Sequence, residues 1–407
     1  MRRRFITLTT LGLLCLLLVA ALQAYAEVQQ EWVARYVNTG DDKGLAIDKD
    51  IYGNVYIGGY IWNGSTYGTD YFAAKYDING RELWHTIIQN AGNDTARAIL
   101  VYGEMTSLAG VYVGGERRVG SFSKFCVVKL DLSDGHVIWT ALSVETGNDF
   151  KGYDIGANSS GVFITGEGWF GSGILAESDL VTYKFAHSDG DVLAEAIWDG
   201  TPATPGNDYG IAIYVDTDAV YVAGCGWIYT GLTPSTDVVV IKYDNNLNEL
   251  WDYTHDRNAF EDILQDITKA GSYVYVTGEA DGILTQKDYV TIKLSASNGS
   301  EVWIRYYDCD GERDAAKAIA HYDNYIYVTG ESKEGTNFDY ATIKYACSNG
   351  NEMWVERYDP PYLGDDYGKD IDVNQYGVFV GGSSEASSSG YSDIATVAYQ
   401  HDGSLLW

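Results

Sequence analysis

Acidic side chains recur at two fixed places in this sequence of 407 residues. One series is an Asp shortly before an apolar run: Asp42, Asp94, Asp208, Asp262, Asp314 and Asp366, with Phe150 beside Asp149 at the remaining place. The other is a Glu directly after a Gly: Glu116, Glu167, Glu279 and Glu331. Carboxylates gathered on one face could hold calcium or act as a pair in glycoside hydrolysis. A repeated Asp at a loop-to-strand junction more often accepts backbone N–H bonds in its own turn, and we expect that role for the Asp series. For the four Glu, a structural or solvated role and ligand contact both stay open.

Aromatic side chains form the second group with binding chemistry. They follow the same Gly in three repeats, where we expect the loop between the second and third strands: Trp62, Tyr67, Trp169, Phe170, Trp227 and Tyr229. Exposed aromatic rings are costly unless they pack or bind something. A stacking platform for sugars or a contact for another protein is the functional interpretation, and packing down onto the fold is the structural one. The predicted ligand-binding set comprises Trp62, Trp169, Phe170, Trp227, Tyr229 and the four Glu.

Signatures of catalysis are missing from the sequence. The six His are scattered, and neither His-x-x-x-His nor Gly-x-Ser-x-Gly occurs, so metalloprotease and serine-hydrolase motifs fail. Cys126 and Cys225 lie in apolar runs and are predicted to be buried free thiols. Cys309 and Cys347 could form a disulfide outside the cell, although the predicted strand order puts them at opposite ends of a blade. No residue is predicted to be catalytic and no cofactor is assigned, although the acidic series could hold calcium.

A repeat of about 54 residues must position these groups. Trp marks it at Trp32, Trp84, Trp139, Trp198, Trp251, Trp303, Trp354 and Trp407. Each interval contains a run ending near Ile, an aromatic–aliphatic–x–Gly run, a run such as Asp237-Val-Val-Val-Ile-Lys-Tyr, and a polar turn before Trp. These short runs are rich in β-branched and aromatic residues and are bounded by Gly, Asn and Asp, which predicts strands. Four strands per repeat predict a β-propeller of seven blades, all-β, in one domain over residues 27–407.

The repeats resemble those of the seven-bladed β-propeller (SBBP) family and its PQQ-like relatives. The resemblance rests on Gly53 to Gly59 (Gly-Asn-Val-Tyr-Ile-Gly-Gly), Asp70 to Asp77 (Asp-Tyr-x-x-x-Lys-Tyr-Asp) and Gly80 to Trp84. It covers the chain after the N-terminal segment. It implies a fold and leaves function open, because propellers carry many unrelated activities.

The repeat has eight marker Trp residues for seven predicted blades, so one Trp segment is left over, and we use it to predict how the ring closes. Glu31 to Tyr36 reads as a full strand without a hairpin partner of its own. We expect this strand, with Trp32, to close the ring as the outermost strand of the last blade. Gly403 to Trp407 would compete for that place or lie beside it.

The N-terminus reads as an export signal. Arg2 to Arg4 precede an apolar run over residues 6–22, and Ala24-Tyr25-Ala26 fits a cleavage site. We expect cleavage after Ala26, although an uncleaved anchor stays open, and no membrane span after it. The net charge of −30 argues against binding to nucleic acid. The sequence therefore predicts a secreted or cell-surface, non-enzymatic propeller that binds extracellular protein or polysaccharide. A glycan-acting enzyme that uses loop-face carboxylates is the alternative, and a quinoprotein-like oxidoreductase is a further one.

Overall fold

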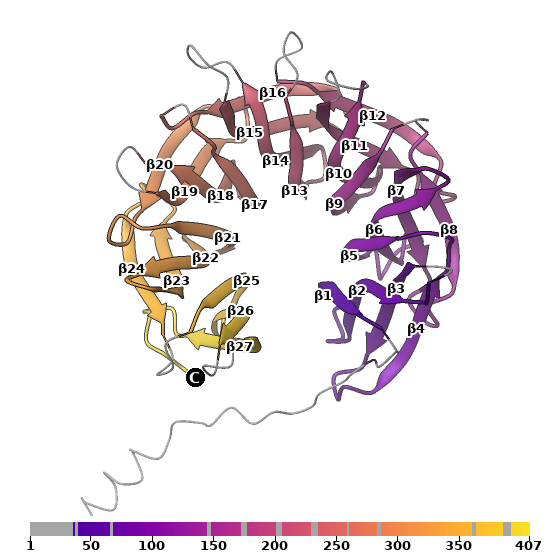
Figure 1. Cartoon of the computed structure of the whole chain (residues 1–407), viewed down its shortest axis with the longest axis horizontal. Coiled ribbons are helices and arrows are strands. Elements are labelled where there is room, and N and C mark those ends of the chain that lie inside the picture. Colours follow the sequence, from indigo (N-terminus) through magenta and orange to yellow (C-terminus); the bar gives the residue numbers. More distant parts are fainter. Residues whose placement is uncertain are drawn as a thin grey trace, which may run out of the picture.

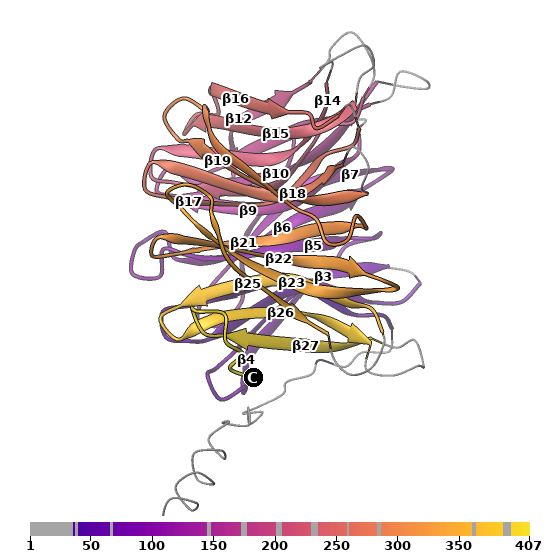
Figure 2. The same cartoon turned by 90° about the vertical axis from the view of Figure 1, so that its left-hand side faces the viewer.

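Seven antiparallel sheets stand around a common axis in the computed structural model (Figure 1). The structure describes Tyr36 and residues 40–65, 68–144, 148–171, 177–200, 206–228, 235–258, 260–282, 286–359, 364–385 and 392–407. Within each sheet the strands follow one another in sequence order, here called a to d from the axis outward. Each sheet is one blade, so the predicted seven-bladed propeller is confirmed. Figure 2 views the ring edge-on.

The strands of the first four blades have these bounds. Blade 1 holds β1 (Lys43–Lys49), β2 (Val55–Trp62), β3 (Thr69–Tyr76) and β4 (Glu82–Ile88). Blade 2 holds β5 (Thr95–Tyr102), β6 (Gly110–Val119), β7 (Phe122–Leu130) and β8 (Val137–Leu142). Blade 3 holds β9 (Phe150–Asn158), β10 (Gly161–Phe170), β11 (Glu177–Phe185) and β12 (Val192–Trp198). Blade 4 holds β13 (Tyr209–Val215), β14 (Ala219–Ile228), β15 (Ser235–Asp244) and β16 (Glu249–His255).

The remaining blades continue the same order. Blade 5 holds β17 (Ile263–Ala270), β18 (Tyr273–Asp281), β19 (Lys287–Ser295) and β20 (Glu301–Tyr307). Blade 6 holds β21 (Asp314–Tyr322), β22 (Tyr325–Glu334), β23 (Asn337–Ala346) and β24 (Glu352–Tyr358). Blade 7 holds β25 (Asp366–Asn374), β26 (Gly377–Glu385) and β27 (Ser392–Tyr399). Leu405 bridges to Tyr399, and Trp407 is hydrogen-bonded to Ala398, so the C-terminus begins the fourth strand of this blade.

One glycine recurs in strand b of all seven blades because strand a bulges toward it. A Cβ built on Gly59 would lie 1.9 Å from the Lys43 carbonyl oxygen, and the other six positions give 1.9–2.1 Å. The same glycines are Gly115, Gly166, Gly224, Gly278, Gly330 and Gly382. No larger side chain fits at that separation, which explains the aromatic–aliphatic–x–Gly pattern of the sequence.

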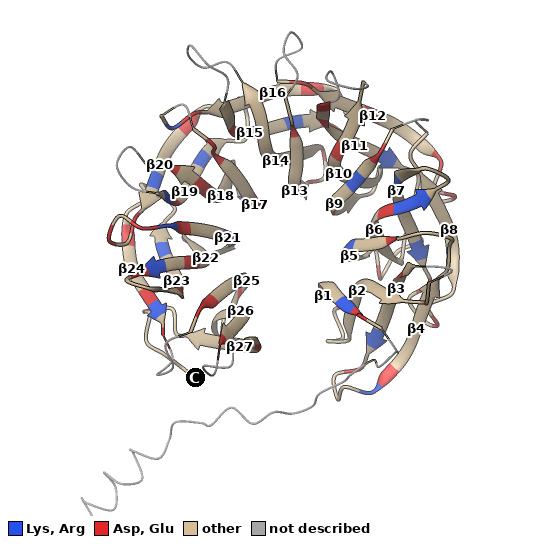
Figure 3. Ribbon diagram, viewed as in Figure 1, with Lys and Arg blue, Asp and Glu red and all other residues tan. Residues whose placement is uncertain are grey.

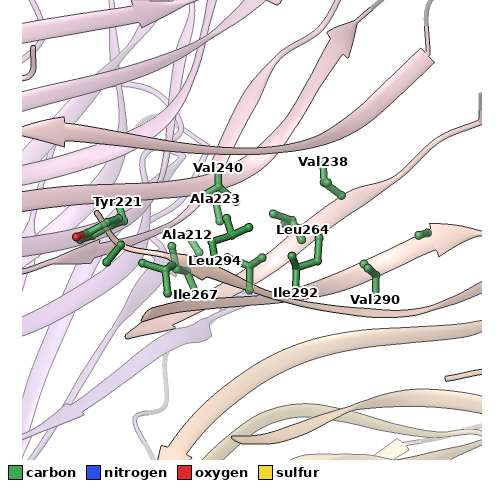
Figure 4. Packing of buried hydrophobic residues seen from close by; sticks show 14 of the residues in the cluster. Ala212, Tyr221, Ala223, Val238, Val240, Leu264, Ile267, Val290, Ile292 and Leu294 are labelled. Carbon is green, nitrogen blue, oxygen red and sulfur yellow. The ribbon is translucent and has the colours of Figure 1, made fainter. Parts of the chain in front are cut away.

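The core lies between neighbouring blades. Figure 4 shows one such layer, in which Val238 and Val240 of blade 4 pack with Leu264, Ile267 and Ile292 of blade 5. These side chains come from alternate positions of the strands, so each blade offers one apolar face to its successor.

A lysine and a tryptophan connect five of the seven blades to the next blade. In blade 5, Lys293 Nζ and Trp303 Nε1 both donate to the Cys347 carbonyl oxygen in the c–d turn of blade 6, at 2.7 and 3.2 Å. The same pair of bonds recurs from Lys75 and Trp84, Lys129 and Trp139, Lys242 and Trp251, and Lys344 and Trp354. We call this pair of bonds the staple. The sequence showed the repeated Lys but gave it no role, because its acceptor is a carbonyl of another repeat.

Blade 3 corrects one assignment made from the sequence. Lys184 still reaches the next blade, at 2.6 Å from the Asn245 carbonyl oxygen. Its cross-strand neighbour is Ala194, however, whereas Lys75 and Lys293 lie opposite Trp84 and Trp303. Trp198, taken from the sequence as the marker of this repeat, lies opposite Leu180 instead. The position equivalent to Trp84 and Trp303 therefore holds Ala194 in blade 3, and the nearby Trp198 was mistaken for it.

The predicted closing strand falls mostly outside the described residues. Of Glu31 to Tyr36, only Tyr36 is described, and its ring lies 4.5 Å from that of Phe72 and 5.2 Å from that of His85 in blade 1. The predicted signal segment, residues 1–26, also lies outside them. None of the described residues forms a helix long and apolar enough to cross a membrane.

Candidate functional site

The candidate site lies on the side of the ring where the b strands end and the next a strands begin, which we call the mouth face. One residue position forms its rim: the third after the repeated Gly of strand b. It holds Trp62, Arg118, Trp169, Trp227, Asp281, Lys333 and Glu385. The backbone N–H of each donates to the preceding d–a loop, as from Trp62 to Asp42 Oδ1 at 2.9 Å and from Arg118 to Asp94 Oδ1 at 2.8 Å. Strand register therefore fixes seven equivalent positions around the mouth.

The predicted aromatic residues occupy strand ends. Trp62 belongs to β2, Trp169 and Phe170 belong to β10, and Trp227 belongs to β14. The prediction that these residues lie in b–c loops was therefore wrong. Tyr67 and Tyr229 lie outside the described residues. The strands continue further than expected because strand c pairs with them up to these residues, for example Trp62 with Thr69.

The aromatic residues do not gather into one platform. Trp62 covers Gly40, and Trp227 covers Gly206 in the same way, because a Cβ on either glycine would lie 2.2 Å from the ring system or its Cβ. Phe170 packs edge-to-face on Phe150, with centroids 5.9 Å apart. Trp62 is 36% exposed, whereas Trp169, Phe170 and Trp227 are half-buried. Blade 2 separates Trp62 from the aromatic residues of blades 3 and 4.

The four predicted glutamates are buried and paired with cations. Glu116 accepts two hydrogen bonds from Arg97 at 2.8 Å, and Lys151 lies 2.6 Å from Glu167. The other contacts are Lys287–Glu279 at 2.9 Å, Arg313–Glu279 at 2.9 Å, Arg313–Glu331 at 3.2 Å, Lys369–Glu331 at 3.5 Å and Lys317–Glu331 at 3.8 Å. Figure 3 shows the resulting acidic and basic segments around the ring.

Ion pairing lowers the pKa of Glu279. Burial acts to raise the pKa of Glu279, but Lys287, Lys317 and Arg313 outweigh it and hold the pKa below its ordinary value. A general acid needs a raised pKa. The pairs therefore suit a charged belt that connects strand b with strand a, with strand c or with the next blade.

A cavity of about 520 Å³ opens at the mouth face over blades 1 to 3. Its lining residues are Trp62, Ser65, Gly68, Gly92, Asn93, Thr95, Glu116, Arg118, Ser123 and Lys151. The cavity brings two predicted residues, Trp62 and Glu116, together. It also contains polar residues that the sequence analysis missed, although Arg118 could have been found as the counterpart of Trp62 after the repeated Gly.

Five of the six repeated Asp residues accept backbone N–H bonds as expected, and Asp366 is the exception because neither of its carboxylate oxygens accepts a hydrogen bond from the described residues. Asp208 accepts from Trp227 N and Gly200 N, and Asp262 accepts from Asp281 N and Arg257 N, all at 2.5–2.9 Å. Burial raises the pKa of Asp208 to about 6 and that of Asp262 to about 7. These carboxyls therefore join loop and strand at a cost in desolvation.

The cysteines agree with the sequence analysis where it made a prediction. Cys126 and Cys225 are free and buried, and burial raises the pKa of both thiols. Cys309 and Cys347 are not bonded to each other.

Comparisons with known proteins agree with this geometry at the level of fold. The structure is similar to the quinohemoprotein alcohol dehydrogenase of Comamonas testosteroni, with TM-score 0.54 and 11% identity over 89% of this chain and 66% of that chain. It is also similar to Chaetomium thermophilum Sqt1 bound to the N-terminus of ribosomal protein L10, with TM-score 0.54 and 12% identity over 89% and 86%. A third is Kuenenia stuttgartiensis hydrazine synthase, with TM-score 0.51 and 11% identity over 89% and 99%.

These similarities agree with the class that the strand topology defines, a seven-bladed β-propeller. The chain spans less than two thirds of the length of the dehydrogenase. At 11–12% identity they carry the fold alone. No family model and no curated protein matches the sequence.

Proposed function

We propose that this protein is an exported, non-enzymatic propeller that binds a polysaccharide at the mouth face of blades 1 to 3. The cavity beside Trp62 is the observation that carries the proposal. It combines one partly exposed indole with hydroxyl, amide and charged groups. Ligand sites commonly pair an apolar surface with a few polar groups that fix orientation, and an indole face beside hydroxyl and amide groups suits a sugar ring.

Several features favour a sugar over a protein surface as the ligand. The cavity is concave and its volume of about 520 Å³ suits a small number of sugar rings. Arg118 and Lys151 add basic groups to its wall, so glycans that contain uronic acid are the first to test. Protein binding remains the alternative ligand class for the same face.

Binding is favoured over catalysis by the state of the carboxylates. Glu116, the glutamate in the cavity wall, accepts hydrogen bonds from two of the three guanidinium nitrogens of Arg97, Nε and Nη2. A carboxylate in such a bidentate pair is poorly placed to donate a proton to a leaving group. The likeness to a quinohemoprotein dehydrogenase concerns the fold and assigns no quinone to this chain.

The test is titration calorimetry with acidic and neutral polysaccharides on the wild type, Trp62→Ala and Trp227→Ala. Both tryptophans hold the rim position and cover a glycine, but only Trp62 lines the cavity. We expect Trp62→Ala to weaken binding at least about tenfold, or about 1.4 kcal/mol, and Trp227→Ala to leave it unchanged. Equal affinity in all three proteins would remove the cavity as the site.

A further inference from the structure

Three aspartates meet at each junction between the later blades. The first stands on strand c, the second directly after strand d of the same blade, and the third at the head of strand a of the next blade. The sets are Asp237, Asp256 and Asp262; Asp288, Asp308 and Asp314; and Asp339, Asp359 and Asp366. In each set, carboxylate oxygens of all three residues lie within 4.8 Å of one another. We call these sets the junction triads.

The triads between blades 5 and 6 and between blades 6 and 7 combine burial with access. Asp314 and Asp366 have no exposed surface, and Asp288 and Asp339 are also buried. Asp308 and Asp359 are exposed, so each triad is open to solvent through one member. This arrangement gives an ion a route to buried oxygens.

Buried oxygens at these two junctions lack partners. Neither carboxylate oxygen of Asp366 accepts a hydrogen bond from the described residues, and Oδ1 of Asp314 likewise accepts none. Ser384 lies close enough to lower the pKa of Asp366 in part, but burial outweighs it. A buried oxygen without a donor costs free energy unless another positive group reaches it.

The fold does not require acids at these positions. At the junction of blades 2 and 3 the equivalent residues are Lys124, Val144 and Phe150, and strand pairing continues there as elsewhere. At the junction of blades 1 and 2, Gln89 stands at the second position. Since the propeller forms these junctions with amide, apolar or basic residues, the acids at the later junctions need another reason.

The charge at these junctions suits a divalent cation. Arg257 Nη1 lies 2.6 Å from Asp288 Oδ2, and Arg357 Nη2 lies 2.7 Å from Asp339 Oδ2. One arginine against three carboxylates leaves each of the two triads with two negative charges in excess. Oxygen ligands from several carboxylates are the donor set that calcium prefers.

We propose that the junction triads between blades 5 and 6 and between blades 6 and 7 bind calcium ions, which connect strands c and d of one blade to strand a of the next. The ligands are one exposed and two buried aspartates at each of these two junctions. The inference is independent of the polysaccharide proposal, because the triads share no residue with the cavity beside Trp62. It uses Asp314 and Asp366 of the repeated Asp series, but the other two ligands of each site come from strand c and from the end of strand d, and none comes from the Glu series.

The test is calorimetric titration of the full chain with calcium chloride after treatment with a chelator and its removal. We expect up to two ions per chain and a higher midpoint of thermal unfolding with calcium. Asp308→Asn and Asp359→Asn should each lower the stoichiometry by one ion, because each removes one exposed ligand and leaves the buried core unchanged. Asp218→Asn is the matched control, since Asp218 is an exposed acid in the a–b turn of blade 4 on the opposite face.

Terbium luminescence gives a second measurement that does not depend on heat release. Terbium bound near the aromatic residues should be displaced by calcium in the wild type and in Asp218→Asn. The double variant Asp308→Asn with Asp359→Asn should retain less of the displaceable signal. Absence of calcium binding in the wild type, or a stoichiometry unchanged by both Asp variants, would overturn the proposal.

Discussion

The junction between blades 5 and 6 and the seam between blades 7 and 1 differ although the same repeat forms both. At the first, Lys293 and Trp303 staple the blades through one carbonyl. At the seam, Ala398 stands where Lys would be, and Trp407 is the last residue of the given sequence. Figure 1 shows the open sector between these two blades.

Side-chain exposure shows the same contrast. Tyr289 and Tyr340 stand directly after the strand-c Asp in blades 5 and 6 and have no exposed surface. Ile394 holds that position in blade 7 and is 92% exposed. Among the described residues, one ion pair is recorded across the seam, from Lys49 to Asp372 at 3.2 Å, and both side chains are largely exposed. Such surface pairs contribute little, so a repeat sequence alone does not make a sealed junction.

The largest expected effect comes from removing one staple tryptophan. Trp303 is 6% exposed, whereas Trp407 is 38% exposed. We expect Trp303→Ala to lower the free energy of unfolding by about 3–5 kcal/mol, through the cavity and the lost hydrogen bond. Trp407→Ala should cost less than half as much. Urea unfolding of both variants measures this, and equal losses would contradict the contrast between junction and seam.

Removing the predicted closing strand tests the seam itself. We expect a chain that lacks residues 27–36 to unfold at a lower temperature than the chain that keeps them. Amide exchange should accelerate most in β27, whose outer edge would lose its partner. If β27 is unaffected, then the segment from Glu31 to Tyr36 does not complete blade 7.

The buried carboxyls predict a pH dependence of smaller size. Burial raises the pKa of Asp94, Asp314 and Asp366 to about 6, above the unfolded value of 3.8. The folded state then binds protons more tightly, so the penalty is complete above about pH 6 and disappears as the pH falls toward 4. In calcium-free buffer we expect the unfolding temperature to rise by a few degrees between pH 8 and pH 5. Asp366→Asn should flatten this profile, and an opposite slope would contradict the assignment.

The smallest expected effect concerns the thiols. Cys126 and Cys225 are fully buried, whereas Cys309 and Cys347 are partly exposed. Under native conditions a thiol reagent should label Cys309 and Cys347 first, and the other two only after unfolding. Cys309→Ser and Cys347→Ser separate the fast phases. Rapid labelling of Cys126 would show that the core between β7 and its neighbours opens readily.

Local patterns predicted much of the architecture. The Gly of strand b and the alternation of apolar residues depend on the geometry within one blade, so the sequence of a single repeat is enough to predict them. The prediction for blade 3 was wrong because Trp198, four residues after Ala194 at the staple position, was taken for the Trp that marks the repeat. The staple and the contacts of Arg313 with Glu279 and of Lys369 with Glu331 could not be inferred in this way, since each joins residues of two blades. The cavity beside Trp62 likewise needs three blades in place.

The direction of the staple gives the ring an order of assembly. Donors always lie on one blade and the acceptor on the next, so Lys293 and Trp303 have no carbonyl to bind until the hairpin that contains Cys347 exists. During synthesis from the N-terminus, each of these blades is therefore completed by its successor, and until then only water can bind the lysine ammonium group at the growing edge. In blade 7 the lysine position holds Ala398, so the lysine bond of the staple cannot form across the seam to blade 1.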